Sequence, residues 1–112
     1  MSNEDDLDAV FKALANPIRR RLLDAMKDGP RTTGQLCEAE PLLDRCTVMQ
    51  HLKTLETADL ILIRREGRER WNHLNALPIK AMHDRWLAPY ARGAVAMLAD
   101  LKTRVEAGEA KD

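Results

Sequence analysis

The chain has 112 residues, of which 45% are hydrophobic and 32% charged, the size and composition of one globular domain. Its 18 basic and 18 acidic side chains cancel, which by itself argues against nucleic-acid binding, but residues 1–8 hold four acids and no base, whereas residues 64–70 hold four arginines against two glutamates. No apolar run approaches the roughly 18 residues that span a bilayer, the N-terminus is acidic rather than basic, and Cys37 and Cys46 are too few for a disulfide scaffold, so we expect a cytoplasmic protein.

Two helices are predicted at the start of the chain. One face of the first, from residue 4 to residue 15, has apolar residues at i, i+3, i+4 and i+7: Leu7, Val10, Phe11 and Leu14. Asn16 is a good N-cap, and Pro17 suits the first position of a second helix because proline lacks the N–H that would be unpaired there. The apolar stripe of the second helix consists of Ile18, Leu22, Leu23 and Met26. Gly29, as a left-handed cap, and Pro30 predict its end.

A helix-turn-helix is predicted next. Thr32, with Gln35 three residues later, has the pattern of a capping box, and the helix that it opens must be short because Pro41 follows. Asp44 is expected to cap the following helix. The inward face of that helix is marked by apolar residues at i, i+4 and i+7: Val48, Leu52 and Leu55. Two helices joined by a turn of a few residues form a helix-turn-helix.

A β-hairpin is predicted directly after this motif. Residues 60–63 form a β-prone run, residues 66–68 a turn, and residues 71–74 a returning strand. A hairpin that follows a recognition helix is a wing. The expected fold is therefore mainly α with a small β-hairpin, a winged helix-turn-helix with a long C-terminal helix.

The last predicted helix begins at Pro78 and runs to about Val105, and Pro89 should kink or break it near residues 85–88. Its apolar stripe fits a dimer seam, an intramolecular core or, third, a cofactor pocket. We favour the dimer, because a chain of this length has too little other surface to cover the stripe. We expect a single domain, residues 1–112, in which residues 7–75 form the winged core and residues 76–105 dimerise together with the N-terminal helix 4–15. The predicted interface residues are Leu7, Val10, Phe11, Ile79, Met82, Trp86, Tyr90, Met97 and Leu101.

The recognition helix is predicted to present a polar face to DNA. When its apolar residues point inward, Cys46, Gln50 and Lys53 lie opposite them, because a helix turns 100° per residue. Glutamine pairs with adenine, lysine reaches guanine or a phosphate, and the N-terminal turn of a helix suits phosphates. A merely solvated face is the alternative, which the basic hairpin that follows makes less attractive. The predicted DNA-binding residues are Arg45, Cys46, Thr47, Met49, Gln50, His51, Lys53, Thr54, Arg64, Arg65, Arg68 and Arg70.

Four ordered motifs resemble those of ArsR-type (arsenic-repressor-like) regulators. Residues 10–23, with Ala15-Asn16-Pro17 at their centre, resemble the opening of these proteins, residues 46–56 their recognition helix, and residues 60–70 their wing. Residues 74–79, with Arg85 and Trp86 after them, are similar to one subgroup of the family. The resemblance implies a homodimer whose first and last helices pack together, and repression that ends when DNA binding is lost.

The chain departs from the family pattern at two places. Met49 stands where relatives often have serine, so one hydroxyl contact is missing. Asp59 stands where a glycine is usual in the turn before the wing, which places a left-handed backbone conformation on an aspartate.

Metal sensing is not expected, and no cofactor is predicted. The resemblance implies that thiolate sensing needs a Cys-x-Cys pair on the helix before the recognition helix. This chain has only Cys37 there. Zinc sensing on the last helix needs a set of Asp, His and Glu ligands, where this chain has only His83 beside Asp84. His51 is interpreted as a structural or phosphate-contacting residue and His73 as an ordinary surface residue.

The predicted function is sequence-specific DNA binding by a homodimeric transcriptional repressor at a palindromic operator, with DNA and a second copy as partners. One alternative is a thiol- or metal-responsive repressor that uses Cys37 and Cys46, although two inert small residues are the favoured interpretation. Another is a winged helix used for protein–protein contact, which should present apolar groups on its recognition face. An enzyme is not expected, because the chain has no nucleophile–base pair, glycine-rich phosphate loop or paired acids in a plausible cleft.

Overall fold

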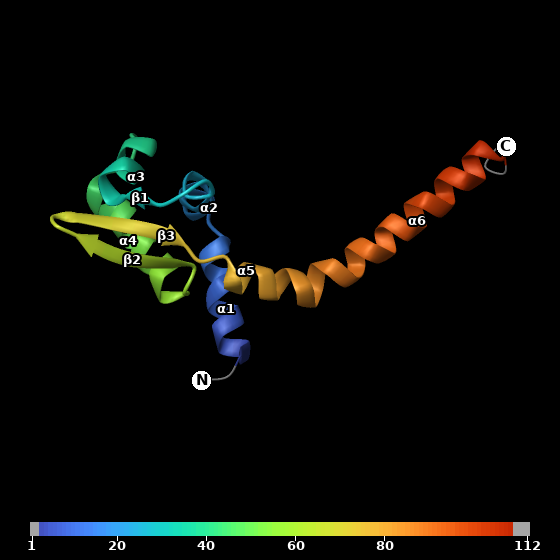
Figure 1. Cartoon of the computed structure of the whole chain (residues 1–112), viewed down its shortest axis with the longest axis horizontal. Coiled ribbons are helices and arrows are strands. Elements are labelled where there is room, and N and C mark those ends of the chain that lie inside the picture. Colours follow the sequence, from blue (N-terminus) through green and yellow to red (C-terminus); the bar gives the residue numbers. More distant parts are fainter. Residues whose placement is uncertain (1–2, 109–112) are drawn as a thin grey trace. The chain divides into compact units, whose positions relative to one another are not determined.

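The computed structural model describes residues 3–108, which fall into two compact units. The winged-helix unit extends to Ile79, and the C-terminal unit begins at Lys80. The winged-helix unit contains, in chain order, α1 (Asn3–Leu14), α2 (Pro17–Ala25), β1 (Arg31–Thr32), α3 (Thr33–Ala39), α4 (Arg45–Thr57), β2 (Ile61–Glu66) and β3 (Glu69–Leu74) (Figure 1). The predicted fold class, a mainly helical winged helix-turn-helix with a small β-hairpin and a long C-terminal helix, is confirmed.

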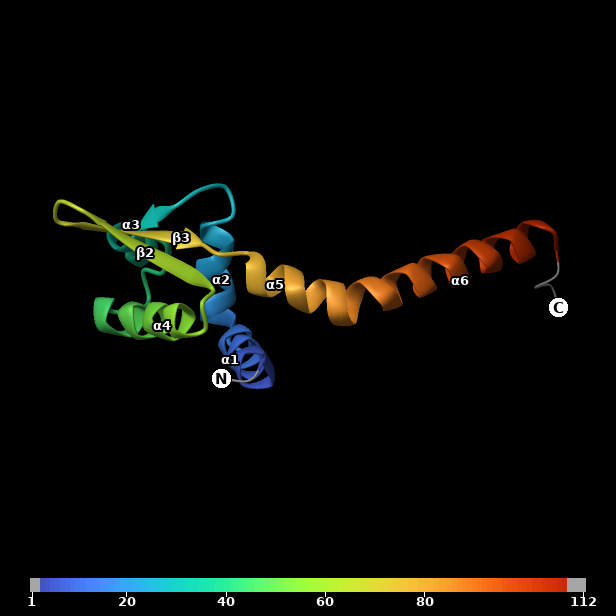
Figure 2. The ribbon, with the colours of Figure 1, turned by 60° about the horizontal axis from the view of Figure 1, so that its bottom comes forward.

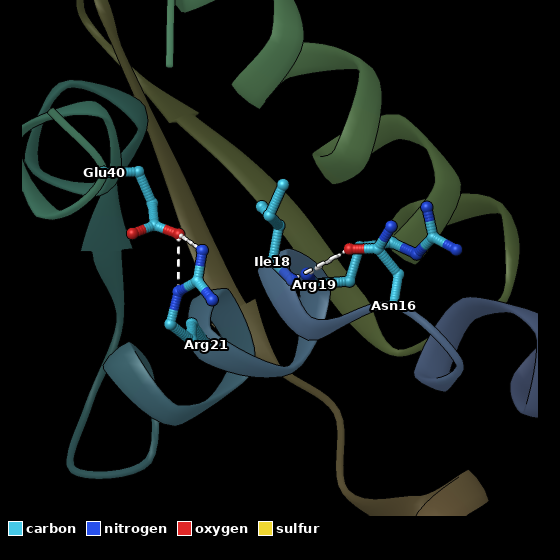
Figure 3. A network of polar contacts seen from close by, with 5 residues as sticks. All are labelled: Asn16, Ile18, Arg19, Arg21 and Glu40. Atoms are coloured by element: carbon cyan, nitrogen blue, oxygen red, sulfur yellow. Dashed lines mark hydrogen bonds and ion pairs between the residues drawn. The ribbon is translucent and has the colours of Figure 1, made fainter. Parts of the chain in front are cut away.

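The predicted N-caps are all present. Asn16 Oδ1 accepts hydrogen bonds from the backbone N–H groups of Ile18 and Arg19 at 2.8 and 3.2 Å, the first of which is drawn in Figure 3. Thr32 and Gln35 form the reciprocal capping box, and Asp44 accepts from the N–H of Thr47 at 2.7 Å. Local sequence therefore fixes where α2, α3 and α4 begin.

The end of α2 differs from the prediction. The helix stops at Ala25, and Met26 is its C-cap, with an N–H that bonds to the carbonyl of Leu23 at 3.0 Å. This bond closes the helix with a tightened last turn well before Gly29, whose φ of +154° lies far from the left-handed helical region. The prediction of Gly29 as a left-handed cap was therefore wrong.

The sheet has one strand more than the predicted hairpin. β3 pairs antiparallel with β2 on one side and with β1 on the other, which gives the order β1–β3–β2. Gly67, with φ of +62°, and Arg68 form the two-residue turn of the hairpin. The left-handed residue predicted before the hairpin is confirmed, because Asp59 has φ of +63°.

The core of the winged-helix unit lies between its helices and the sheet. α4 packs against β2 and against α1, α2 and α3, and Figure 2 shows it along one side of the hairpin. The ion pair between Arg21 of α2 and Glu40, at 2.7 Å, ties α2 to the end of α3 (Figure 3). The buried apolar side chains are Val10, Ala13, Leu22, Leu23, Met26, Leu36, Val48, Leu52, Leu55, Ala58, Leu60 and Ile61.

Helical structure continues from the end of the winged-helix unit into the C-terminal unit. α5 (Leu77–Met82) is followed by the π-helical turn η1 (His83–Leu87) and by α6 (Ala88–Glu106). Pro89 explains η1, because proline has no N–H to donate to the carbonyl of Arg85, four residues back. The N–H of Ala88 bonds to the carbonyl of His83, five residues back, which is the π-helical pattern. A kink or break was predicted near residues 85–88; the structure has a π-helical distortion at residues 83–87 and no break, because helical structure continues through it. None of the helices in the described part of the chain is both long and apolar enough to cross a membrane.

Candidate nucleic-acid interface

α4 separates an apolar face from a polar one. Val48, Leu52 and Leu55 are at most 3% exposed and anchor the helix in the core. Thr47 and Met49 are half-buried, and the side chains exposed on the outer face include Cys46, Gln50, Lys53 and Thr54. The predicted inward and outward division of α4 is confirmed, and the contact of its outer face with DNA stays a prediction.

The first turn of α4 offers less to a phosphate than its sequence suggested. The Asp44 carboxylate accepts a hydrogen bond from the N–H of Thr47 at 2.7 Å. Its interactions with Thr47, that hydrogen bond first, hold the pKa of Asp44 below its usual value, so the cap is negatively charged at neutral pH. Arg45 is exposed and takes no part in this cap, and it is the better candidate for a phosphate contact at this end of α4.

His51 is held in place by an arginine that sequence reasoning did not single out. Arg19 donates through Nε to the carbonyl of Ala13 at 2.7 Å, through Nη2 to that of Lys12 at 3.0 Å, and its Nη1 lies 3.2 Å from His51 Nδ1. Because a guanidinium only donates, Nδ1 must accept, which places the proton of a neutral His51 on Nε2. Burial, and next the positive charge of Arg19, lower the pKa of His51.

Arg19 thus links the end of α1 to α4 through one side chain. The structural role that we considered for His51 is present in this contact. Its phosphate-contacting role stays a prediction, which the Nε2–H tautomer would serve because that group is a donor. Hydrophobic periodicity does not indicate this role of Arg19, because its hydrogen-bond partners lie 6, 7 and 32 residues away in the chain.

The arginines of the wing have different surroundings. Arg64 pairs with Glu66 at 3.4 Å. Arg65 and Arg68 are exposed, and Arg70 is half-buried. The structure brings the last three together with Arg45 of α4 around one hollow, which also touches the start of α3. Arg45 and three of the four predicted wing arginines therefore line one hollow within one unit, although their DNA contacts stay predicted.

The candidate metal and thiol residues do not gather. Cys37 is half-buried, Cys46 is exposed, and both are free thiols. The Nδ1 atom of His83 lies 3.4 Å from the carboxylate of its neighbour Asp84, and His73 is half-buried in β3. Within residues 3–108, no group of three or more His, Cys, Asp or Glu side chains could hold a metal ion.

The predicted dimer residues fall into two groups. Val10 is 3% exposed and belongs to the core, so it offers almost no surface to a second chain, and Ile79 is half-buried against the same core. Leu7, Met82 and Trp86 are half-buried, with the Arg85 guanidinium 4.4 Å from the Trp86 ring centroid. The predicted interface residues with exposed side chains are Phe11, Tyr90, Met97 and Leu101.

Comparison with known proteins gives these surfaces a context. Residues 14–64 match a helix-turn-helix domain family. The transcriptional repressor SdpR of Bacillus subtilis is 35% identical over 66 residues, which cover 59% of this chain and 72% of that protein. The HTH-type transcriptional regulator Rv2034 of Mycobacterium tuberculosis is 34% identical over 82 residues, 73% of this chain and 76% of the relative. The crystal structure of an ArsR family transcriptional regulator superposes with a TM-score of 0.71 at 28% identity, covering 81% of this chain and 92% of the other.

The chain belongs to the ArsR-type winged helix-turn-helix family of transcriptional regulators. It is a DNA-binding regulator and not an enzyme. α4 is by its position the recognition helix, and the β2–β3 hairpin is the wing.

Proposed function

We propose that this protein is a homodimeric repressor that reads a palindromic operator with α4 and grips the flanking backbone with its wing. The observation that carries the proposal is the pairing of two polar surfaces in one unit. The outer face of α4 exposes Gln50 and Lys53, and the adjoining hairpin exposes Arg65 and Arg68. A module for protein–protein contact would instead present apolar groups there.

The two surfaces have different tasks in this proposal. Gln50 lies at the centre of the exposed face of α4, where its amide can donate to and accept from one adenine edge in the major groove. The wing arginines cannot distinguish bases through phosphates, but they add affinity and fix the register of the protein on the duplex. Specificity therefore comes mainly from the helix, and salt-dependent affinity mainly from the wing.

The C-terminal unit supports the dimer in this proposal. Its helices follow one another along the chain, and the large apolar side chains of α6 are exposed. Tyr90 and Met97 are each 74% exposed, and Leu101 is 52% exposed. A second copy would bury this stripe, and two-fold symmetry would match a palindromic operator. We assign dimerisation to residues 76–105 with the N-terminal helix, and DNA binding to the core of residues 7–75.

A gel-shift titration tests the proposal. Purified protein is titrated against the DNA upstream of its own gene and against a shuffled duplex of the same length and base composition, at several salt concentrations. We expect binding to the upstream DNA to be tighter, with a stoichiometry of two chains per site. Equal affinity for the two duplexes at every salt concentration would contradict operator recognition, and a single chain per site would contradict the dimer.

A further inference from the structure

A polar side chain lies in the core at the base of the wing. Of the large side chains that are fully buried between residues 3 and 108, that of Asn72 in β3 alone is polar. Asparagine is depleted in strands and is seldom fully buried, because its amide must find partners away from water. An apolar residue would suit the position, since Asn72 pairs across the hairpin with Ile63. A residue that departs from local preference in this way points to a role other than its own burial.

The amide of Asn72 joins the wing to two other elements. Its Nδ2 donates to the carbonyl of Arg31 in β1 and to the hydroxyl of Thr33, each at 3.2 Å. Thr33 is itself only 3% exposed, and it is the first residue of α3. β1, the start of α3 and the wing are therefore connected through one side chain, although the two acceptors lie 41 and 39 residues away in the chain.

The backbone connection between the wing and β1 is short. β1 has two residues, which pair with β3 at Asn72 and Trp71, whereas β2 and β3 pair along their whole length. The base of the hairpin also packs against α4 through β2. Apolar packing has no preferred direction, whereas a hydrogen bond requires a defined angle. The two bonds of the Asn72 amide are therefore well placed to define the direction in which the hairpin projects.

The same side chain weakens the core in which it lies. In the described part of the chain, two buried side-chain polar atoms have no hydrogen-bond partner, and both belong to β3: Nε of Arg70 and Oδ1 of Asn72. Alternate residues of a strand share a face, so both residues lie on the face of β3 that also contains Leu74, which packs against the core. A buried acceptor without a partner costs free energy. A buried polar group of this kind can contribute defined geometry in place of stability.

We propose that Asn72 is a positioning residue for DNA binding, whose amide fixes the direction in which the wing leaves the helix-turn-helix. α3 packs against α4, so a wing tied to the first residue of α3 is held in a defined position relative to the recognition helix. A hairpin that is already oriented loses less entropy when the protein binds DNA. The consequence for DNA binding rests on the proposed function, whereas the control of wing direction by Asn72 does not.

Residual dipolar couplings of the backbone N–H groups, measured by NMR on the full chain without DNA, test the wing direction. Asn72→Leu keeps the branching of the side chain and removes both hydrogen bonds. We expect the couplings of residues 65–70 to depart from the wild-type orientation, while those of α4 stay as they are. Ile63→Val is the matched control, because Ile63 pairs with Asn72 across the hairpin and its truncation breaks no hydrogen bond. Wild-type wing couplings in Asn72→Leu, or the same departure in Ile63→Val, would overturn the proposal.

Two variants of Thr33 test the same bond from its other end, and they serve if Asn72→Leu unfolds, as thermal melting would show. Thr33→Val keeps the shape of the side chain and removes the hydroxyl that accepts from Asn72, whereas Thr33→Ser keeps the hydroxyl. We expect the wing couplings to change in Thr33→Val and to stay at wild-type values in Thr33→Ser. The same couplings in both variants would overturn the proposal.

DNA binding separates this inference from the proposed function. Asn72→Leu should weaken binding to the upstream DNA and to a random duplex alike by about tenfold, the scale of a coupling between two parts of a fold. The salt slope should fall by about 0.9 for each phosphate that is no longer neutralised, because the outer face of α4 is unchanged and only the wing has moved. A displaced wing with wild-type affinity and salt slope would refute the role of the wing in the proposed function and the consequence for DNA, but not the control of wing direction. An undisplaced wing beside intact binding to the upstream DNA would refute the role of Asn72 and leave the proposed function intact.

Discussion

The winged-helix unit and the C-terminal unit solve the problem of burying apolar side chains in opposite ways. The first unit encloses a contiguous core between helices and sheet, with Leu36, Val48 and Leu55 fully buried. No residue of η1 or α6 is buried, although both contain large apolar side chains. The first unit thus has a core of its own, whereas η1 and α6 contribute no buried side chain to one.

Ion pairs along α6 do not replace a core. Asp100 with Arg104, and Lys102 with Glu106, stand at i,i+4 spacing, with N–O distances of 3.0 and 3.8 Å. Such exposed pairs each stabilise a helix by roughly 0.3–0.5 kcal/mol, far less than burial of one leucine side chain. The comparison teaches that the folding of one unit and the association through the other should respond to different mutations.

The largest effect is expected from the core of the winged-helix unit. Leu52→Ala removes a side chain that is 3% exposed and leaves a cavity beneath α4, so it should lower the free energy of unfolding by about 2–5 kcal/mol. Urea denaturation followed by circular dichroism measures the change. Leu62→Ala in the wing is the control, since Leu62 is 52% exposed and its truncation should cost less than about 0.5 kcal/mol. Similar destabilisation in the two variants would contradict the described core.

The next effect concerns association through the C-terminal unit. Trp86→Ala removes a half-buried ring from the predicted seam and should weaken dimerisation by about ten- to a hundredfold, the range of an aromatic interface residue. Sedimentation velocity across a dilution series measures it, with Lys102→Ala as an exposed control. A wild-type monomer at micromolar concentration would refute the dimer, and a dimer unaffected by Trp86→Ala would move the seam elsewhere.

Within the winged-helix unit, recognition should divide between helix and wing. Gln50→Ala should cost about 1–3 kcal/mol in operator affinity and relax specificity at one position of each half-site. Arg68→Ala should weaken binding to operator and random DNA alike and flatten the salt dependence, because fewer counterions are released. Fluorescence anisotropy with both duplexes separates the two. Equal scaling of all affinities by Gln50→Ala would mean that α4 only docks on phosphates.

A smaller effect is expected from pH. The pKa of His51 is lowered, so the unfolded chain binds a proton more readily than the folded one, and stability falls as pH drops below the ordinary histidine value of 6.5. The decline ends below the folded pKa, where both states are protonated. His51→Gln should remove this part of the slope between pH 7.5 and pH 5.5 in urea midpoints. An unchanged slope would show that folding does not lower the pKa of His51.

No effect is expected from metals. Cys37, Cys46 and His83 have incomplete ligand sets, so zinc, cadmium, arsenite or a chelator should leave DNA affinity unchanged in anisotropy titrations. A tenfold or larger shift that disappears in Cys37→Ser or Cys46→Ser would show that these thiols form a sensor. The metal would then act on the DNA-binding helices themselves, because Cys37 lies in α3 and Cys46 in α4.

Sequence alone was sufficient for the starts of the helices, although the end of α2, also a local feature, was placed too late at Gly29. The caps at Asn16, Thr32 and Asp44 satisfy N–H groups two or three residues away, and Pro89 acts on the turn directly before it. The inward face of α4 follows from helical periodicity, and the left-handed Asp59 was expected from the resemblance to a family that usually has glycine in the turn before the wing. These features need no knowledge of what packs where, because their partners are set by chain geometry.

Tertiary structure decided what depends on distant partners. β1 is only two residues long and exists because β3 pairs with it, Arg19 finds His51 across two helices, and Val10 enters the core instead of the expected seam. Neither spacing nor composition could indicate that Arg45 would join three wing arginines around one hollow. Burial of the apolar side chains determines how the helices and the sheet pack, and this packing decides which polar side chains become neighbours. Because the hydrophobic effect is not directional, the sequence pattern alone does not indicate those neighbours.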